Sequence, residues 1–195
     1  MNRKLVLASN SPRRKELLKG LGYDFEVRII DNIDESYPEG LPCRDIPCYI
    51  AEAKAEAYKP TLAEDELLIT ADTIVVLDGR VLGKPKDADD AKRMLRALAG
   101  RTHQVITGVS LTAADRQRTF ACVTDVEFAP LSDAEIDYYV ERYKPLDKAG
   151  AYGIQEWIGF VAVRGINGSY FNVMGLPIQR LYTELRHFLE MPHKA

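Results

Sequence analysis

Apolar positions recur along the chain at two spacings, one typical of strands and one typical of helices. Leu5–Ala8 is a short apolar run of the kind that forms a buried strand. Leu17, Leu18 and Leu21 are spaced for the inner face of a helix over residues 12–20. The same patterns predict strands over residues 25–30, 67–77, 80–82, 103–113 and 118–128, and helices over residues 46–59, 88–99, 133–143 and 177–189.

Turn and cap residues mark several boundaries of these elements. Asp78-Gly79 is a favoured two-residue hairpin turn. Ser132, with Glu135 three residues later, has the spacing of a capping box at the start of a helix. Asn167-Gly168 is a second hairpin-type turn and predicts a hairpin over residues 158–171.

Strands and helices therefore alternate through most of the sequence. This order predicts an α/β fold built on a mixed sheet. A length of 195 residues is typical of one domain, and the chain shows no internal repeat, linker or block of like charge. We therefore expect a single domain over residues 1–195.

Composition and charge exclude several classes of partner. The net charge is -3 with 26 basic and 29 acidic residues, so no overall positive field would attract nucleic acid or an anionic membrane. No apolar run approaches the roughly 20 residues that a membrane span needs. Three cysteines without a C-x-x-C pair suggest neither a disulfide framework nor a zinc site. We expect a cytoplasmic protein with no nucleic-acid or membrane partner.

The first predicted helix begins with an unusual charge pattern. Ser11 is a natural N-cap, yet Arg13, Arg14 and Lys15 follow it in the first turn. A helix N-terminus already carries about +0.5 of dipole charge, so each cation there costs roughly 0.3–1 kcal/mol. Free N–H groups, the Ser9 and Ser11 hydroxyls and two guanidinium groups would together suit a phosphate chain. The alternative is a solvated basic face.

Asp72 is the second residue that departs from its surroundings. It is the only charge within the apolar run of residues 67–77. A buried, unpaired carboxylate costs several kcal/mol, so this side chain is expected to meet a metal, a cation or an exposed cleft. The alternative is a strand end or bulge at which Asp72 faces water.

Three further charged residues are ambiguous by themselves. Lys84 lies between Gly83 and Pro85, where it could contact a phosphate, but the glycine spacing excludes a P-loop. Lys54 lies in an alanine-rich stretch of a helix, where Glu and Lys usually form surface pairs. Glu35, in a polar loop, could be a second ligand of a hard divalent cation or could simply be solvated.

Five motifs occur in a fixed order over most of the chain. They are Leu7–Arg14, Ala71–Thr73, Gly83–Pro85, Asp147–Gln155 and Gly168–Pro177. This ordered set resembles the Maf family of septum-formation-inhibitor-like nucleotide pyrophosphatases. The resemblance implies a fold of the inosine-triphosphate-pyrophosphatase type, with two lobes around a central cleft. It also implies cleavage of a nucleoside triphosphate to the monophosphate and pyrophosphate, and a link to arrest of cell division.

The resemblance also implies roles for individual residues. Asp72 matches the family's catalytic carboxylate. Positions that match the family's nucleotide and phosphate site are Ser9, Arg13, Arg14, Glu35, Lys54, Lys84 and Gln155. The set of Arg13, Thr73 and Gln155 looks like that of members that take dTTP and UTP.

The implied chemistry uses a divalent cation, Mg²⁺ or Mn²⁺, held by Glu35, Asp72 and substrate oxygens. Asp72 would orient or deprotonate the attacking water, and Arg13, Arg14, Lys54 and Lys84 would neutralise the leaving group. Two alternatives stay open: a non-catalytic nucleotide-binding regulator of septum formation, and a phosphatase that releases orthophosphate stepwise. We expect a homodimer, because symmetric dimers are the commonest assembly of soluble enzymes.

Overall fold

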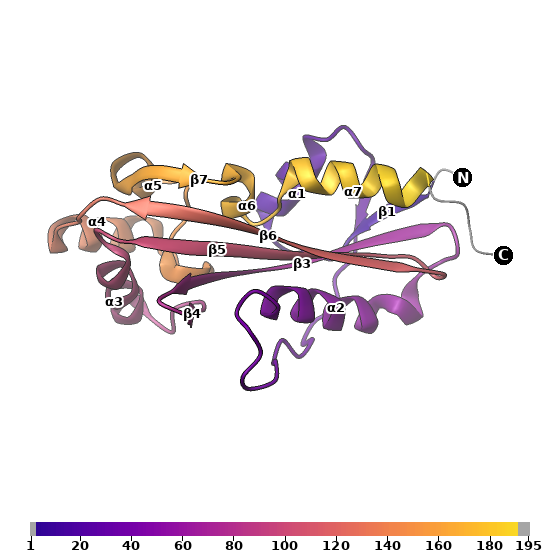
Figure 1. Ribbon diagram of the computed structural model, residues 1–195, viewed down its shortest axis with the longest axis horizontal. Coiled ribbons are helices and arrows are strands. Elements are labelled where there is room, and N and C mark those ends of the chain that lie inside the picture. Colours follow the sequence, from indigo (N-terminus) through magenta and orange to yellow (C-terminus); the bar gives the residue numbers. More distant parts are fainter. Residues whose placement is uncertain (1–2, 191–195) are drawn as a thin grey trace. The chain divides into compact units, whose positions relative to one another are not determined.

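The computed structural model describes residues 3–190 (Figure 1). Its helices are α1 (Pro12–Lys19), α2 (Ile46–Tyr58), α3 (Ala88–Leu98), α4 (Asp133–Tyr143), α5 (Trp157–Ala162), α6 (Tyr170–Met174) and α7 (Ile178–Glu190), with short 3-10 turns at Lys59–Thr61 and Ala149–Ala151. Its strands are β1 (Lys4–Leu7), β2 (Phe25–Val27), β3 (Glu66–Leu77), β4 (Arg80–Leu82), β5 (Thr102–Thr112), β6 (Gln117–Phe128) and β7 (Val163–Asn167). Within the described residues, no helix is both long and apolar enough to cross a membrane.

Seven strands of the described chain form one sheet in the order β2-β1-β3-β5-β6-β7, with β4 beside β3. β1 runs parallel to both neighbours, so that Leu5 lies opposite Phe25 on one side and Leu67 on the other. β4 and β7 run antiparallel to their partners, β3 and β6. The predicted α/β fold with a mixed sheet is therefore confirmed.

The chain forms two compact units, each made of segments that are separate in the sequence. Within the described residues, unit 1 consists of residues 3–72, 107–122 and 175–190. Unit 2 consists of Thr73–Ile106 and Val123–Met174. The strands β3, β5 and β6 each contribute residues to both units, and β3 passes from one to the other at the bond between Asp72 and Thr73.

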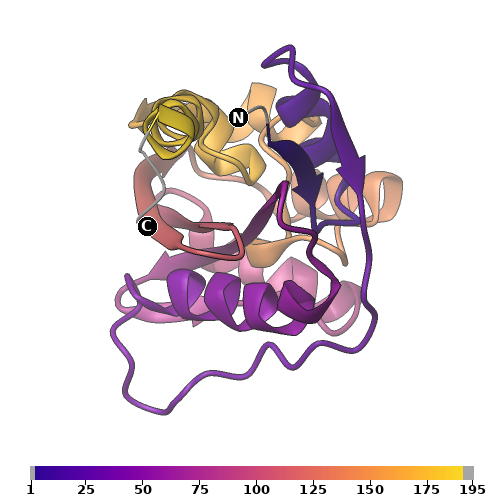
Figure 2. The same ribbon diagram turned by 90° about the vertical axis from the view of Figure 1, so that its right-hand side faces the viewer.

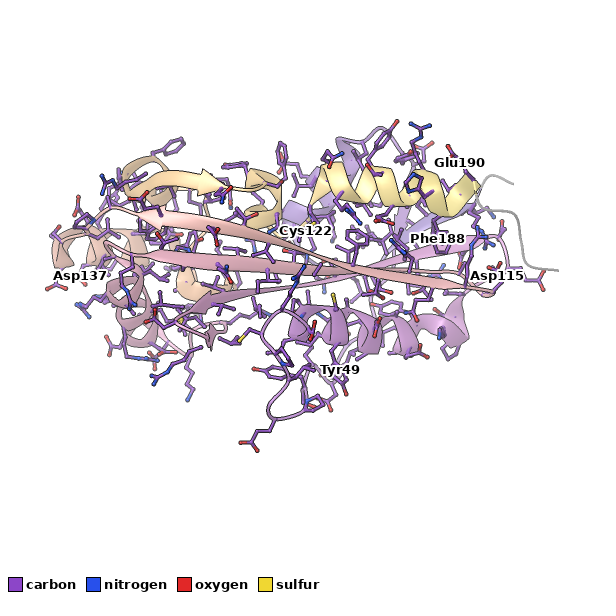
Figure 3. All side chains as sticks on the ribbon, in the orientation of Figure 1. Tyr49, Asp115, Cys122, Asp137, Phe188 and Glu190 are labelled. Carbon is purple, nitrogen blue, oxygen red and sulfur yellow. The ribbon has the colours of Figure 1, made fainter. Side chains whose placement is uncertain are left out.

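In unit 1, helices cover both faces of the strands. α2 lies on one face, and α1 and α7 lie on the other (Figures 1 and 2). Val6, Leu68 and Ala55 are fully buried in a cluster between the strands and α2. On the opposite face, Phe188 of α7 is buried, and the Arg116 guanidinium lies 4.6 Å from the centre of its ring (Figure 3). A cation over an aromatic face adds electrostatic attraction to the packing of α7.

α2 packs unusually close to the strands of unit 1. A Cβ atom at Gly108 of β5 would lie 2.3 Å from the carbonyl carbon of Pro47, in the first turn of α2. Farther along the helix, the buried Thr70 hydroxyl of β3 donates a 2.6 Å hydrogen bond to the Ala51 carbonyl oxygen. The absence of a side chain at Gly108 and the short Thr70 side chain thus hold α2 against the sheet.

Unit 2 has its own core, in which α3 and α4 pack on the ends of the long strands. Leu95, Phe128 and Ile136 are among its most buried side chains. His103 is also buried, with Nε2 2.7 Å from the Tyr152 hydroxyl oxygen. Burial lowers the pKa of His103 to about 4, so the ring is neutral near neutral pH.

The hairpin predicted over residues 158–171 is wrong. This region forms the helix α5, the edge strand β7 and the helix α6. A short apolar run such as Ile158–Ala162 has no periodicity that separates a strand from a buried helix. The deciding residue is Gly159, where a Cβ atom would lie only 1.7 Å from the Ile154 carbonyl oxygen. The helical turn can form there because glycine allows this close backbone approach.

Replacing Gly108 by alanine tests the close packing of α2. Gly108→Ala should lower the free energy of unfolding by about 1–3 kcal/mol, because the new methyl group overlaps the α2 backbone rather than a flexible side chain. Urea denaturation followed by circular dichroism measures this change. Gly83→Ala is the matched control, because a Cβ atom there meets no atom within 4 Å. Equal stability of the two variants would contradict the packing described here.

Candidate active site

The connection from β1 to α1 is organised by two serine hydroxyls. The buried Ser9 side chain accepts a 3.2 Å hydrogen bond from the Ser11 backbone N–H. Ser11 is the N-cap of α1, and its hydroxyl accepts a 3.4 Å hydrogen bond from the Arg14 backbone N–H. The predicted N-cap is therefore confirmed, and the first turn of α1 begins directly after a buried strand.

Arg14 connects three segments of unit 1. Its Nε donates a 2.8 Å hydrogen bond to the Gly175 carbonyl oxygen, and Nη1 donates a 2.9 Å hydrogen bond to the Ala71 carbonyl oxygen. Burial lowers the pKa of Arg14, whereas the negative charge of Asp72 acts in the opposite direction. The cation that conflicts with the helix dipole is thus stabilised by two carbonyl dipoles and a carboxylate.

Asp72, Lys54 and Glu35 form a charged cluster in unit 1. The Lys54 Nζ atom lies 2.9 Å from Asp72 Oδ1 and 2.9 Å from Glu35 Oε1. The side chains of Lys54 and Asp72 are only 13% and 14% exposed, whereas Glu35 is 49% exposed. The two carboxylate oxygens are at most 5.8 Å apart, since each is 2.9 Å from one nitrogen. Lys54 is therefore not a solvated surface lysine.

The loop that carries Glu35 is tied to α2 near its start and closed by a local turn around Glu35. The Ile30 N–H donates a 2.7 Å hydrogen bond to the Tyr58 hydroxyl, and the Ser36 N–H donates a 2.9 Å hydrogen bond to Asp34 Oδ1. The hydrogen bonds from the Ser36 N–H and hydroxyl to the Asp34 carboxylate lower the pKa of Asp34. The contact with Tyr58 and the local turn restrict a polar loop of this length and so help to keep the Glu35 carboxylate near Lys54.

A hollow of about 550 Å³ lies between this loop and α2. It is lined by Ile30, Asp31, Asn32, Ile33, Asp34, Ser36, Tyr49, Ala53, Glu56 and Ala57. Tyr49 projects from α2 on the side away from the strands (Figure 3). The lining includes Ala53, Asp34 and Ser36, which are sequence neighbours of Lys54 and Glu35, but none of the three residues of the charged cluster themselves.

The other predicted site residues lie in unit 2. Thr73 follows Asp72 directly in β3 and is half-buried. Lys84 is exposed in the loop after β4, and the carbonyl of the preceding Gly83 accepts a 3.0 Å hydrogen bond from the Gly150 N–H. Gln155 lies at the end of the same glycine-rich segment, and its Oε1 atom is buried without a hydrogen-bond partner among the described residues.

The structure therefore groups the predicted residues by unit. The set in unit 1 consists of Ser9, Arg13, Arg14, Glu35, Lys54 and Asp72, and the set in unit 2 consists of Thr73, Lys84 and Gln155. The positive charge of Arg13 is close enough to lower the pKa of Arg14, after the larger effects of burial and Asp72.

Sequence patterns do not indicate a polar group close to Gln155 in the chain, which consists of the buried Tyr139 and Lys148 and the half-buried Glu156. Lys148 lies in one of the five motifs, but nothing in its local sequence shows that it is buried. Tyr139 occupies an inward-facing position of α4 that any large apolar residue could fill. The sequence pattern therefore does not indicate a role for its hydroxyl.

Comparison with known proteins identifies the family. The model of the family described as Maf-like protein matches residues 4–188. This chain belongs to the Maf-like family. The match spans all five motifs and confirms the resemblance that they carry.

Maf-like relatives align with nearly the whole chain. A protein of Phocaeicola vulgatus named dTTP/UTP pyrophosphatase is 66% identical over 183 residues, which are 94% of this chain and 95% of that protein. A protein of Parabacteroides distasonis with the same name is 60% identical over 185 residues, 95% of this chain and 96% of that protein. Among solved structures, a HAM1 protein from Coxiella burnetii aligns with a TM-score of 0.49 at 15% identity, over 95% of this chain and 99% of that one.

The role of Arg14 as a connector leads to a stability prediction. Arg14→Lys should lower the free energy of unfolding by about 1–3 kcal/mol, because one ammonium group cannot reproduce the two directed N–H bonds to Gly175 and Ala71. Urea denaturation measures the loss. The same substitution at Arg186, an exposed residue of α7 paired with Glu190, should leave stability nearly unchanged. A similar midpoint for both variants would show that Arg14 is not a structural connector.

Proposed function

We propose that this protein is a nucleoside triphosphate pyrophosphatase that hydrolyses dTTP and UTP to the monophosphate and pyrophosphate. The observation that carries the proposal is the cluster in which one buried lysine, Lys54, bridges the carboxylates of Asp72 and Glu35. The names of the 66% and 60% identical relatives support the same activity and substrates. We further propose that the chain acts as one functional domain in the cytoplasm.

In this mechanism, Asp72 acts on the water that attacks the α-phosphorus. Its carboxylate orients the water and accepts its proton as the bond to phosphorus forms and the bond to the bridging oxygen breaks. The displaced pyrophosphate carries concentrated negative charge, which is neutralised by Arg13, Arg14, Lys54 and Lys84. The Ser9 hydroxyl, whose oxygen accepts the Ser11 N–H, contributes its own O–H as a hydrogen-bond donor to the phosphate chain.

The carboxylates of Asp72 and Glu35 fit a divalent cation such as Mg²⁺ or Mn²⁺. They are hard oxygen ligands that already converge on one positive centre, the Lys54 ammonium group. Among residues 3–190, no cluster of three or more His, Cys, Asp or Glu side chains could hold a metal, so the remaining ligands would be substrate and water oxygens. When bound, the cation would polarise the phosphate oxygens and stabilise the charge that develops on them.

Base selection is assigned to Arg13, Thr73 and Gln155. The Gln155 amide is the group best suited to a uracil or thymine ring, because its Oε1 atom is a buried acceptor without a partner among the described residues. The imide edge of these bases offers one N–H donor and carbonyl acceptors, which a primary amide can match with one acceptor and one donor.

A substrate panel tests the proposed activity. With Mg²⁺ or Mn²⁺, the protein should release pyrophosphate and the monophosphate from dTTP and UTP faster than from CTP, ATP or GTP. Asp72→Asn should reduce kcat by at least ~10²-fold, because the amide cannot accept the proton of water. Chromatography of the nucleotide products together with a pyrophosphate assay gives the readout. Orthophosphate as the first product would indicate a stepwise phosphatase, and binding without turnover would indicate a regulator; either would refute the proposal.

Removing Lys54 tests whether its ammonium group occupies the place of a cation. Lys54→Met should raise Mn²⁺ affinity in the absence of nucleotide by at least ~10-fold. The substitution removes a positive charge that lies 2.9 Å from an oxygen of each carboxylate and repels the metal ion. The same variant should lose most activity, since the leaving group then lacks one of its cations. Electron paramagnetic resonance of free Mn²⁺ measures the affinity.

Lys59→Met is the matched control for this experiment. Lys59 lies just after α2 and pairs with the exposed Glu56, so its loss should leave Mn²⁺ affinity unchanged. An unchanged affinity in Lys54→Met would mean that the metal does not use the Asp72 and Glu35 carboxylates.

A further inference from the structure

A buried polar network surrounds the residue that follows Gln155. Glu156 Oε1 lies 3.2 Å from the Lys148 ammonium nitrogen, and the Tyr139 hydroxyl donates a hydrogen bond to Glu156 Oε2. The Tyr139 hydroxyl in turn accepts a 3.0 Å hydrogen bond from the Gly153 backbone N–H. Tyr139 is fully buried, and the side chains of Lys148 and Glu156 are 9% and 19% exposed.

Each member of this network depends on the others. Both oxygens of the Glu156 carboxylate are used, one by a cation and one by a hydroxyl. Burial and the contact with Glu156 raise the pKa of Tyr139, so its hydroxyl keeps the proton that it donates. Removing one partner would leave a buried charge or donor unsatisfied, which is far more costly than losing a surface ion pair.

The network fixes both ends of a tight turn that contains Gln155. At one end the Gly153 N–H is bound by Tyr139, and at the other the Glu156 side chain is bound by Tyr139 and Lys148. The turn itself is closed by a 2.9 Å hydrogen bond from the Glu156 N–H to the Gly153 carbonyl oxygen. The backbone of Gln155 therefore has little freedom to rotate.

The side-chain amide of Gln155 is restricted by the same turn. A Cβ atom at Gly153 would lie 2.9 Å from Gln155 Nε2 and 3.0 Å from the carboxyl carbon of Glu156. The amide nitrogen and the Glu156 carboxyl group thus lie over the bare Gly153 backbone, while the amide oxygen is buried without a partner in the described part of the chain.

We propose that Glu156, Tyr139 and Lys148 are positioning residues that hold the Gln155 amide in one orientation and thereby select uracil and thymine over cytosine. The inference rests on the proposed function. Uracil and thymine present an N3–H donor beside the O4 acceptor, whereas cytosine presents the N3 acceptor beside an amino donor. A primary amide free to flip by 180° serves both patterns, and a fixed amide serves only one.

Two substitutions that preserve shape test this role. Tyr139→Phe removes the hydroxyl that joins Gly153 to Glu156, and Glu156→Gln removes the charge that Lys148 neutralises. The readouts are kcat and KM for UTP, dTTP and CTP on the same preparation. The ratio of kcat/KM for UTP to that for CTP should fall by at least ~10-fold in both variants, mainly through KM, because the amide no longer rejects the cytosine pattern.

The ratio is independent of how much of each variant is folded, because both substrates are measured on one sample. Tyr138→Phe and Glu141→Gln are matched controls on α4, and both side chains are exposed. They should keep the wild-type ratio.

The outcomes separate this inference from the proposed function. If the wild-type protein cleaves no triphosphate, or cleaves CTP as well as UTP, the proposed function fails. If the wild-type protein prefers UTP and the variants lose activity on all substrates in parallel, the network has only a structural role and the inference fails. Competition between UTP and CTP for binding to each variant, with Asp72→Asn as background, gives the same comparison without turnover.

Discussion

The charge of Asp72 within an apolar strand is the constraint on which the rest of unit 1 depends. A carboxylate that is 14% exposed needs a cation in contact, and Lys54 supplies it from α2. Lys54 can reach Asp72 only if α2 lies close to β3, and the hydrogen bond from Thr70 to Ala51 holds the helix there. The packing that builds the core of unit 1 is thus the same packing that assembles its charged cluster.

The local grouping of cations matters more for a small anionic ligand than the whole-chain net charge of -3. A long polyanion requires a broad positive surface, whereas a triphosphate requires a few cations in one place. In unit 1, Arg14 is held by two carbonyl oxygens and Lys54 by two carboxylates. Such preorganised cations lose little reorganisation energy when a phosphate group replaces part of their environment.

Sequence patterns predicted most of the fold because most elements have strong periodicity or clear caps. The capping box of Ser132 and Glu135 and the turn at Asp78-Gly79 are confirmed as predicted. The hairpin over residues 158–171 was wrong because the close approach of Gly159 to Ile154 is a tertiary contact that no local pattern records.

The residues of the candidate site also differ in how far the sequence alone could predict their environment. Asp72 could be recognised from its neighbours alone, since a lone charge in an apolar run conflicts with burial. Lys54 could not, because a lysine among alanines and glutamates on a helix has the same local pattern whether it faces water or a carboxylate. The burial of Lys148 could not be predicted for a related reason. It depends on an ion pair with Glu156, which lies eight positions later in the sequence.

The charged cluster and the polar network around Glu156 belong to different compact units of the chain. The cluster of Lys54, Asp72 and Glu35 lies in unit 1, whereas the network around Glu156 lies wholly in unit 2. Residues without shared partners have nearly additive effects on free energy. Under the proposed function, a substitution that reorients the Gln155 amide would alter which base is accepted while Lys54 keeps its ion pairs with Asp72 and Glu35. Under that proposal, selectivity for the base would diverge within this fold at little cost to the chemistry of the phosphate chain.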